Sequence, residues 1–283
     1  MALILPRCLD CVVAIGAPGD NGNETRWLAS GFLFGKLIGQ DGDGKPLYGV
    51  YLVTNRHVLR GLTSMVLRFN SQEGQPAREY HESLMDRYGR SKWFAPENEA
   101  VDVVVTPINV KKLEADGIEM AFYRSERDVA NRAGLSELGT TEGDGVFVLG
   151  YPLGLVGGGR NYVIVRSGSI ARIQDCLANI AQEFLLDCFI FPGNSGGPVM
   201  LKPEIASIEG TKCTGRSWLI GVVRAYIPFE DFAVSQQTGE PRISFVENSG
   251  LASVVPMDFV DQAISECEKG MKERDADDVQ CGR

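Results

Sequence analysis

The sequence predicts an all-β protein made of two β units and a C-terminal helix. Short apolar segments rich in Val, Ile, Phe and Leu recur along the 283 residues, separated by glycine. Many of them alternate apolar and other side chains, as Phe147, Leu149 and Tyr151 do. A charged, helix-tolerant region at 111–140 divides the segments into two groups. This pattern favours a β-barrel or β-sandwich protein over alternating strands and helices.

The apolar segments give the expected strands, which are listed by unit. In the first unit they lie at 11–16, 27–37, 47–54, 64–70 and 100–108. In the second unit they lie at 145–150, 162–173, 183–191, 199–201, 218–227 and 252–256. Residues 40–46 have Asp-Gly turn chemistry and are expected to form a hairpin tip.

The expected organisation follows from these groups. The first β unit spans 8–115, a connection spans 116–140, and the second β unit spans 141–256. After it, apolar side chains at helical spacing predict an amphipathic helix over 257–272. The charged residues 273–283 are expected to fray.

Composition excludes several partners and compartments. The net charge of −9 argues against nucleic acids and anionic membranes, which attract basic surfaces. The longest apolar runs are too short to cross a membrane, and Pro6 and Arg7 interrupt the first one, so neither a transmembrane segment nor a signal peptide is predicted. We therefore expect a cytoplasmic protein.

The seven cysteines are expected to be reduced, and Cys8 and Cys11 are expected to be structural thiols rather than a metal or redox site.

The most informative motif is Gly193-Asn194-Ser195-Gly196-Gly197-Pro198, directly after the strand-like segment 183–191. Glycine and proline around a serine are typical of a tight, exposed turn that carries a nucleophile. The neighbouring backbone N–H groups are then free to stabilise an oxyanion. The motif predicts chemistry on an acyl group at Ser195.

A serine nucleophile needs a base, and the chain has only two histidines. His57 follows the apolar strand 51–54, whereas His81 lies in a polar, charged run. A catalytic histidine must be held rigidly, so His57 is the candidate base and His81 is expected to be a solvated surface residue. Without the serine motif, His57 would be interpreted as a hydrogen-bonded histidine of the core.

A serine nucleophile and its histidine base need a third residue, a carboxylate that orients the imidazole. Asp102 begins the strongly apolar segment 102–105, where an acid is costly to bury without a partner. The alternative is a solvated aspartate at the end of a strand. Asp187 is the other acid in apolar surroundings, and we expect it to have a structural role.

Chain order separates the serine-hydrolase architectures. No histidine follows Ser195, which excludes the Ser…Asp…His order of α/β-hydrolases. Asp10 or Asp20 would allow the subtilisin order, but that fold needs alternating strands and helices, and Gly196-Gly197-Pro198 is a poor helix start. The order His57, Asp102, Ser195 in an all-β chain remains.

These motifs resemble those of the trypsin-like (chymotrypsin-fold) serine peptidases, most closely the bacterial-type and HtrA-like branch. Thr54-x-x-His57, the run 102–105 and the loop 193–198 carry the resemblance. Further similar segments lie at 29–33, 149–154, 165–170, 219–223 and 253–256, so that it covers about residues 11–265. The resemblance implies two six-stranded antiparallel Greek-key β-barrels with a C-terminal helix.

The resemblance also implies roles for individual residues. His57 would be the general base and acid, Asp102 its orienter and Ser195 the nucleophile. The N–H groups of Gly193 and Ser195 would form the oxyanion hole, and the strand Arg224-Ala225-Tyr226 would pair with the substrate backbone. No metal or cofactor is implied.

Specificity follows from two more positions. Phe189 stands where trypsins have an acid at the base of the S1 pocket, and Tyr226 stands where they have an open glycine. We therefore expect small aliphatic P1 residues, not basic ones.

Asn194 replaces the aspartate that receives a new N-terminus in secreted trypsins, so activation by N-terminal cleavage is not expected. HtrA proteins carry a PDZ domain after the protease, and we do not expect one within the residues of this sequence.

The expected function is that of a serine endopeptidase acting on protein or peptide substrates through an acyl-enzyme, with an unidentified regulatory partner as an option. The alternatives are a catalytically silent or partner-gated binding module on the peptidase fold, and an acyl hydrolase that is not a protease.

Overall fold

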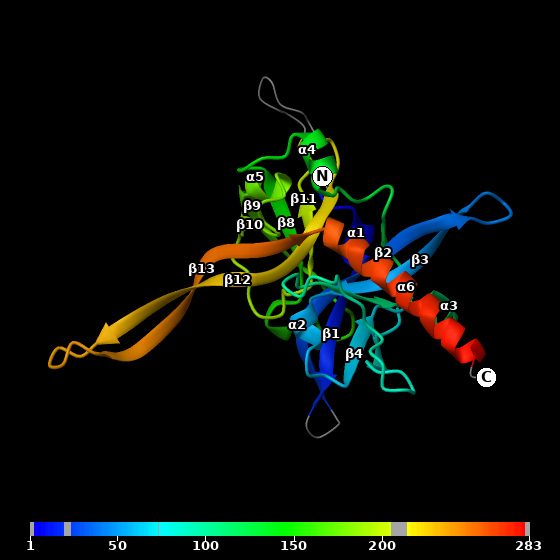
Figure 1. The fold of residues 1–283 in the computed structure, drawn as a ribbon, viewed down its shortest axis with the longest axis horizontal. Helices are drawn as coiled ribbons and strands as arrows, with labels where there is room; N and C mark the ends of the chain where they lie inside the picture. Colours follow the sequence, from blue (N-terminus) through cyan, green and yellow to red (C-terminus); the bar gives the residue numbers. More distant parts are fainter. Residues whose placement is uncertain (1–2, 20–23, 73, 205–213, 281–283) are drawn as a thin grey trace.

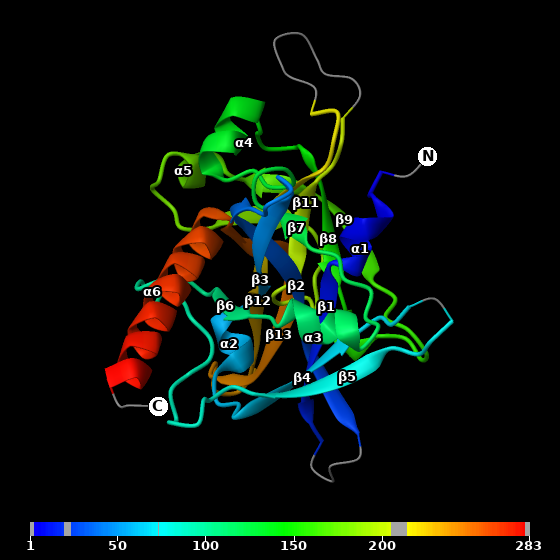
Figure 2. The ribbon, with the colours of Figure 1, turned by 90° about the vertical axis from the view of Figure 1, so that its right-hand side faces the viewer.

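The computed structural model describes residues 3–19, 24–72, 74–204 and 214–280. The chain is mostly β, and it places two β units against one another with a long C-terminal helix beside them (Figure 1; Figure 2). The predicted fold class is therefore confirmed.

The first unit is a seven-stranded sheet, so the six-stranded, wholly antiparallel barrel that the resemblance implied for this unit is wrong in strand number and in one pairing. Its order is β5-β4-β1-β2-β3-β6, and β7 pairs in parallel with β2 while the other pairs are antiparallel. The strands are β1 (Val12–Pro18), β2 (Thr25–Gln40), β3 (Pro46–Thr54), β4 (Ser64–Phe69), β5 (Arg78–Ser83), β6 (Val104–Pro107) and β7 (Tyr123–Arg124). β5 was not predicted, because this edge strand carries polar residues on both faces. His81 lies on β5 and is exposed, as expected.

The second unit is a closed six-stranded antiparallel barrel, as predicted. The strands follow one another around it in the order β10-β13-β12-β11-β8-β9. They are β8 (Gly145–Gly150), β9 (Ile164–Arg172), β10 (Phe184–Asp187), β11 (Pro198–Leu201), β12 (Trp218–Val234) and β13 (Pro241–Pro256).

The predicted limits differ most from the structure for four strands. β6 begins at Val104, so the segment 100–103 is not a strand. β10 ends at Asp187, and the residues after it turn toward the serine loop. β12 and β13 are far longer than predicted, because they continue beyond the barrel as a two-stranded ribbon through residues that had the composition of a loop (Figure 1).

Between β6 and β8 the chain is mostly irregular apart from β7, and it carries two short helices, α3 (Val110–Ala115) before the predicted connection and α4 (Arg132–Leu138) within it. Each begins at an asparagine whose side chain accepts a backbone N–H of the first turn: Asn109 from Lys112, and Asn131 from Gly134. The other short elements are α1 (Pro6–Asp10), α2 (Arg56–Leu59), η1 (Pro152–Gly154) and α5 (Gln174–Leu177).

The C-terminal helix α6 (Asp258–Gln280) contacts both units. Its apolar face, which includes Ala263, Ile264 and Cys267, is buried. Lys36 of β2 pairs with Asp261 at 2.6 Å, and the backbone N–H of Arg132 donates to Asp258 at 2.9 Å. The helix is longer than predicted, because it continues from residue 272 to Gln280 through the charged segment that was expected to fray.

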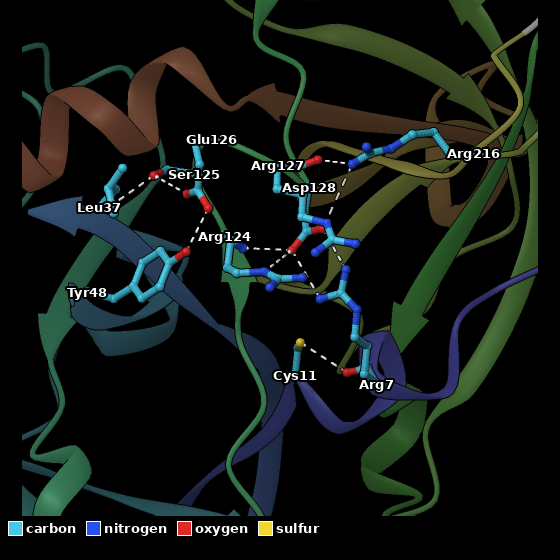
Figure 3. Close-up of polar contacts among 10 residues, drawn as sticks. All are labelled: Arg7, Cys11, Leu37, Tyr48, Arg124, Ser125, Glu126, Arg127, Asp128 and Arg216. Carbon is cyan, nitrogen blue, oxygen red and sulfur yellow. Dashed lines mark hydrogen bonds and ion pairs between the residues drawn. The ribbon is translucent and has the colours of Figure 1, made fainter. Parts of the chain in front are cut away.

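Asp128 is the main polar junction between the units (Figure 3). Its buried carboxylate accepts two hydrogen bonds from Arg7, at 3.0 and 2.5 Å, and one from the backbone N–H of Arg124 at 2.9 Å. Its carbonyl accepts the N–H of Leu219 on β12. Burial would raise the pKa of Asp128, but the hydrogen bonds from Arg7 and Arg124 outweigh it and lower that pKa. Asp128 thereby joins the N-terminal helix, the connection and the barrel.

Cys8 and Cys11 are buried free thiols, Cys8 in α1 and Cys11 directly before β1. Burial raises the pKa of both thiols, and Cys11 Sγ lies 3.1 Å from the carbonyl of Arg7. Within the described ranges, no group of acidic, cysteine and histidine side chains could hold a metal ion. Cys213 and Cys281 lie outside these ranges.

No helix in the described part of the chain is both long and apolar enough to span a membrane.

Candidate active site

His57 and Asp102 form a closely bonded pair. His57 lies in the short helix α2, immediately after β3, rather than at the end of the strand itself. Its Nδ1 is 2.5 Å from Oδ2 of Asp102, and its backbone N–H donates to Oδ1 at 2.9 Å. The buried side chain of Asn55 donates to the carbonyl of Asp102 at 2.7 Å. Two contacts therefore fix the carboxylate relative to His57, and the third holds the backbone of Asp102.

Asp102 lies two residues before β6, so the prediction that it begins a strand is wrong. Its side chain is mostly buried, and burial alone would raise its pKa. The hydrogen bonds from His57 and the nearby charge of Arg224 outweigh that effect and lower the pKa of Asp102. The carboxylate is thus ionised at neutral pH and can stabilise a charged imidazole.

The serine loop follows the segment 188–191 and precedes β11. Ser30 of β2 holds it: the Ser30 hydroxyl donates to the carbonyl of Gly193 at 2.7 Å, and the Ser30 N–H donates to the carbonyl of Ser195 at 2.9 Å. Thr54 in turn donates to the carbonyl of Ser30 at 2.9 Å. Because Ser30 and Thr54 belong to the first unit and the loop to the second, these bonds fix the two halves of the site together.

Two backbone N–H groups of this loop are left without a partner among the described residues, those of Gly193 and Ser195. The N–H groups of Asn194, Gly196 and Gly197 all donate to backbone carbonyls. The carbonyl of Pro192 accepts the N–H of Leu153 at 2.6 Å, so the next N–H, that of Gly193, points the opposite way along its trans peptide. Gly193 has a φ of 99°, which favours glycine. The two free N–H groups are those predicted for the oxyanion hole.

No hydrogen bond between the Ser195 hydroxyl and His57 occurs within the described part of the chain. Catalytic hydrogen bonds are often long in ligand-free sites and tighten when substrate binds. The side chain of His57 is 48% exposed, so the ring faces solvent on the side away from Asp102.

The predicted substrate-binding residues lie on two adjoining segments. Ala225 and Tyr226 belong to β12, with Ala225 exposed and Tyr226 half-buried against the barrel core. Phe189 is 55% exposed and lies beside Gly250. The Arg224 side chain also reaches the acid beside His57, because its Nε is 3.7 Å from Oδ2 of Asp102 and its guanidinium pairs with Glu183 at 2.6 Å.

A family model of the trypsin-like peptidase domain matches residues 29–203 of the chain. The match covers more than half of the sequence, and it includes both His57 and the serine loop. The chain belongs to the trypsin-like peptidase domain family.

Solved structures similar to this trypsin-like peptidase domain include three at low identity. The HtrA-type protease AlgW with tripeptide is 18% identical at a TM-score of 0.45, over 92% of this chain and 60% of that one. The MamO protease domain of Magnetospirillum magneticum is 16% identical at 0.45, over 90% of this chain and 96% of that one. An inactive form of Rv3671c from M. tuberculosis H37Rv is 13% identical at 0.43, over 93% of this chain and 92% of that one. No curated protein sequence matches the chain.

Several side chains that support this site had no predicted role. Ser30 and Asn55 are both buried and bond the backbone of site residues. Glu183 holds Arg224 beside Asp102. Two of these roles could have been found in the sequence: Asn55 directly precedes the helix that carries His57, and Ser30 lies in the segment 29–33 that resembles the peptidase family. No sequence feature points to Glu183, because its contact with Arg224 depends on the tertiary fold.

Proposed function

We propose that this trypsin-like peptidase domain is a serine endopeptidase that cleaves peptide bonds through Ser195, His57 and Asp102. The observation that carries the proposal is the pair formed by His57 Nδ1 and Asp102 Oδ2 at 2.5 Å. A carboxylate in that position selects the imidazole tautomer whose Nε2 can accept a proton. The family match and the two free N–H groups of the serine loop support the same role.

The chemistry follows in two steps. His57 accepts the proton of the Ser195 hydroxyl as the oxygen attacks the carbonyl carbon of the substrate, and the N–H groups of Gly193 and Ser195 stabilise the oxyanion. The protonated imidazole then gives its proton to the leaving amine, which leaves an ester on Ser195. In the second step water, deprotonated by His57, hydrolyses that ester. Asp102 stays ionised throughout and stabilises the imidazolium.

The substrate is a polypeptide whose backbone pairs with Arg224-Ala225-Tyr226 as an added strand. We propose that P1 is a small aliphatic residue. The large ring of Tyr226 would narrow the entrance to the pocket, and Phe189 offers no carboxylate to a basic side chain. A cleavage profile dominated by Lys or Arg at P1 would contradict this specificity.

A fluorophosphonate probe and a peptide library test the function together. The wild-type protein is expected to be labelled at neutral pH and to cleave peptides after Ala or Val, and Ser195→Ala is expected to do neither. Labelling without peptide cleavage would favour a non-protease acyl hydrolase. Absence of both would favour a binding module, silent or gated by a partner.

A further inference from the structure

Beyond the barrel, β12 and β13 form a ribbon that projects away from the rest of the molecule (Figure 1). Its strands pair from Pro228 opposite Asn248 to Val234 opposite Pro241, with one register shift between Ala233 and Val234. We call residues 228–248 the ribbon. A two-stranded ribbon alone is at best marginally stable in water, so an extension of this length requires a further contact to explain it.

The ribbon exposes large apolar side chains on both faces. Directly opposed residues share a face, so Phe229, Ile243 and Phe245 lie on one face and Phe232, Val234 and Val246 on the other. Each of the six is about half exposed, from 49% for Phe245 to 59% for Val234. Exposed apolar groups gathered in this way mark an interaction site. Since both faces are apolar, a partner that lies along the edge and reaches both faces fits better than one that covers a single face.

Among the described strands, both edges of the ribbon lack a further partner, and the edge formed by β12 begins beside Ser195. We call this β12 edge the open edge. β12 pairs with β11 as far as Val222, and Val223 exchanges hydrogen bonds of 2.9 Å with Gly196 and Gly197. From Arg224 to Val234, the described strands give β12 only one partner, β13. At about 3.3 Å per residue, this open edge is about 35 Å long. It continues the strand that the proposed function assigns to the substrate backbone.

The direction of β12 decides which part of a substrate would lie there. β12 runs outward from the serine loop, so a strand added antiparallel to it runs inward and ends at Ser195. Antiparallel pairing is slightly more stable per residue than parallel pairing. The ribbon therefore faces residues on the N-terminal side of the scissile bond.

We propose that the open edge of the ribbon binds an extended polypeptide segment N-terminal to the scissile bond, as an added antiparallel strand. This inference rests on the proposed function and adds a substrate class to it. The substrate segment is unfolded, with apolar side chains at alternating positions that contact the ribbon's aromatic residues. Pro228 has no N–H, so the backbone ladder is interrupted at that residue.

Charge favours such a peptide over a second copy of the chain. The ribbon carries Glu230, Asp231, Glu240 and Glu247 against a single Arg242. Two ribbons, or a ribbon and another molecule of net charge −9, would repel one another. The same acids attract Lys or Arg. The expected segment thus alternates apolar and basic residues.

The base of the ribbon is fixed to the segment that leads into the serine loop. The Asn248 side chain donates to the carbonyl of Ile190 at 2.6 Å, and the N–H of Cys188 donates to the carbonyl of Gly250 at 2.9 Å. A strand bound along the ribbon would therefore enter the site in a defined register relative to Ser195.

Matched peptides test the proposal. A fluorogenic core peptide is extended on its N-terminal side by about ten alternating Val and Lys residues, enough to follow the open edge, and a second peptide carries the same extension on its C-terminal side. We expect the N-terminal extension to raise kcat/KM about tenfold or more and the C-terminal one to leave it within about twofold.

Variants of the ribbon provide a second test of the proposal. In Phe229→Ser combined with Phe232→Ser, the ratio of kcat/KM between the N-terminally extended and the core peptide should fall toward one. The control is Ile180→Ser, which should preserve the ratio, because it replaces an apolar residue that is even more exposed, at 81% against 55% for Phe229 and 52% for Phe232, and far from the ribbon in sequence. Circular dichroism and fluorophosphonate labelling show whether each variant is folded.

The outcomes separate this inference from the function on which it rests. If the core peptide is cleaved but the N-terminal extension gives no gain, the ribbon proposal is overturned and the peptidase stands. If nothing is cleaved, fluorescence anisotropy with the Ser195→Ala protein still tests the ribbon, since the N-terminally extended peptide should bind more tightly than the core. If the ribbon variants instead abolish self-association in sedimentation velocity, the ribbon is an interface between copies and the proposal is wrong.

Discussion

At the residue scale, the site depends on how Asp102 is held. The carboxylate contacts His57 twice and lies 3.7 Å from Arg224, which Glu183 positions in turn. Removing its charge while keeping its shape would leave the imidazole without the partner that selects its tautomer. Both members of the pair could be predicted from the sequence, because an acid beside an apolar run and a histidine after a strand are local features. The Arg224 side chain could not be predicted as their neighbour, since that contact arises only in the folded molecule.

We expect Asp102→Asn to lower kcat/KM for a peptide by about 10³–10⁴-fold, because the amide cannot stabilise the imidazolium. Steady-state kinetics measures the loss. Asp187→Asn is the matched control, since Asp187 is an exposed acid on β10 and its replacement should change kcat/KM by less than about twofold. Equal losses in both variants would argue against a specific role for Asp102.

At the scale of elements, the serine loop is shaped by the strands behind it. Gly196 has a φ of 81°, and a Cβ there would collide with the carbonyl oxygen of Ser30 and the side chain of Thr54. The loop can therefore lie against β2 and β3 only because this position is glycine. The cluster of glycines predicted a tight turn, but not that the turn would pack on strands of the other unit.

Gly196→Ala should lower the free energy of unfolding by at least about 2 kcal/mol, from the left-handed conformation and the collision together. Urea denaturation monitored by tryptophan fluorescence measures the change. Gly158→Ala serves as the control, because no atom lies within 4 Å of the added Cβ and its φ is not positive, so a change below about 0.5 kcal/mol is expected. A neutral Gly196→Ala variant would show that the loop adjusts freely.

At the scale of the whole molecule, buried contacts across the two units assemble the site. One core cluster contains residues of β1, β2, β8, β12 and α6, and the Asp128 junction adds a polar connection (Figure 3). Hydrophobic alternation predicted the barrel strands and the final helix, since these segments have one buried face. It did not predict the ribbon, because residues 228–248 mix apolar and acidic residues with Pro228, Gly239 and Pro241 and bury almost nothing.

Asp128→Asn should destabilise the protein by about 2–3 kcal/mol at pH 7, since a buried carboxylate that pairs with arginine is lost. The pKa of Asp128 is lowered in the folded state, so its contribution is present above the unfolded pKa of about 3.9 and disappears as the pH falls through the folded pKa. Urea denaturation between pH 7 and pH 3 should show the two proteins converging below about pH 4. A difference that persists unchanged at pH 3 would contradict this account.

The most direct test of the proposed peptidase is to trap the ester on Ser195. Wild-type protein is mixed with 4-nitrophenyl acetate, quenched in acid and digested, and the peptide that contains Ser195 is examined by mass spectrometry. The account predicts one added acetyl group on Ser195, absent from Ser195→Ala and strongly reduced in His57→Ala. A folded wild-type protein that carries no acetyl group on Ser195, or carries it equally without His57, would contradict it.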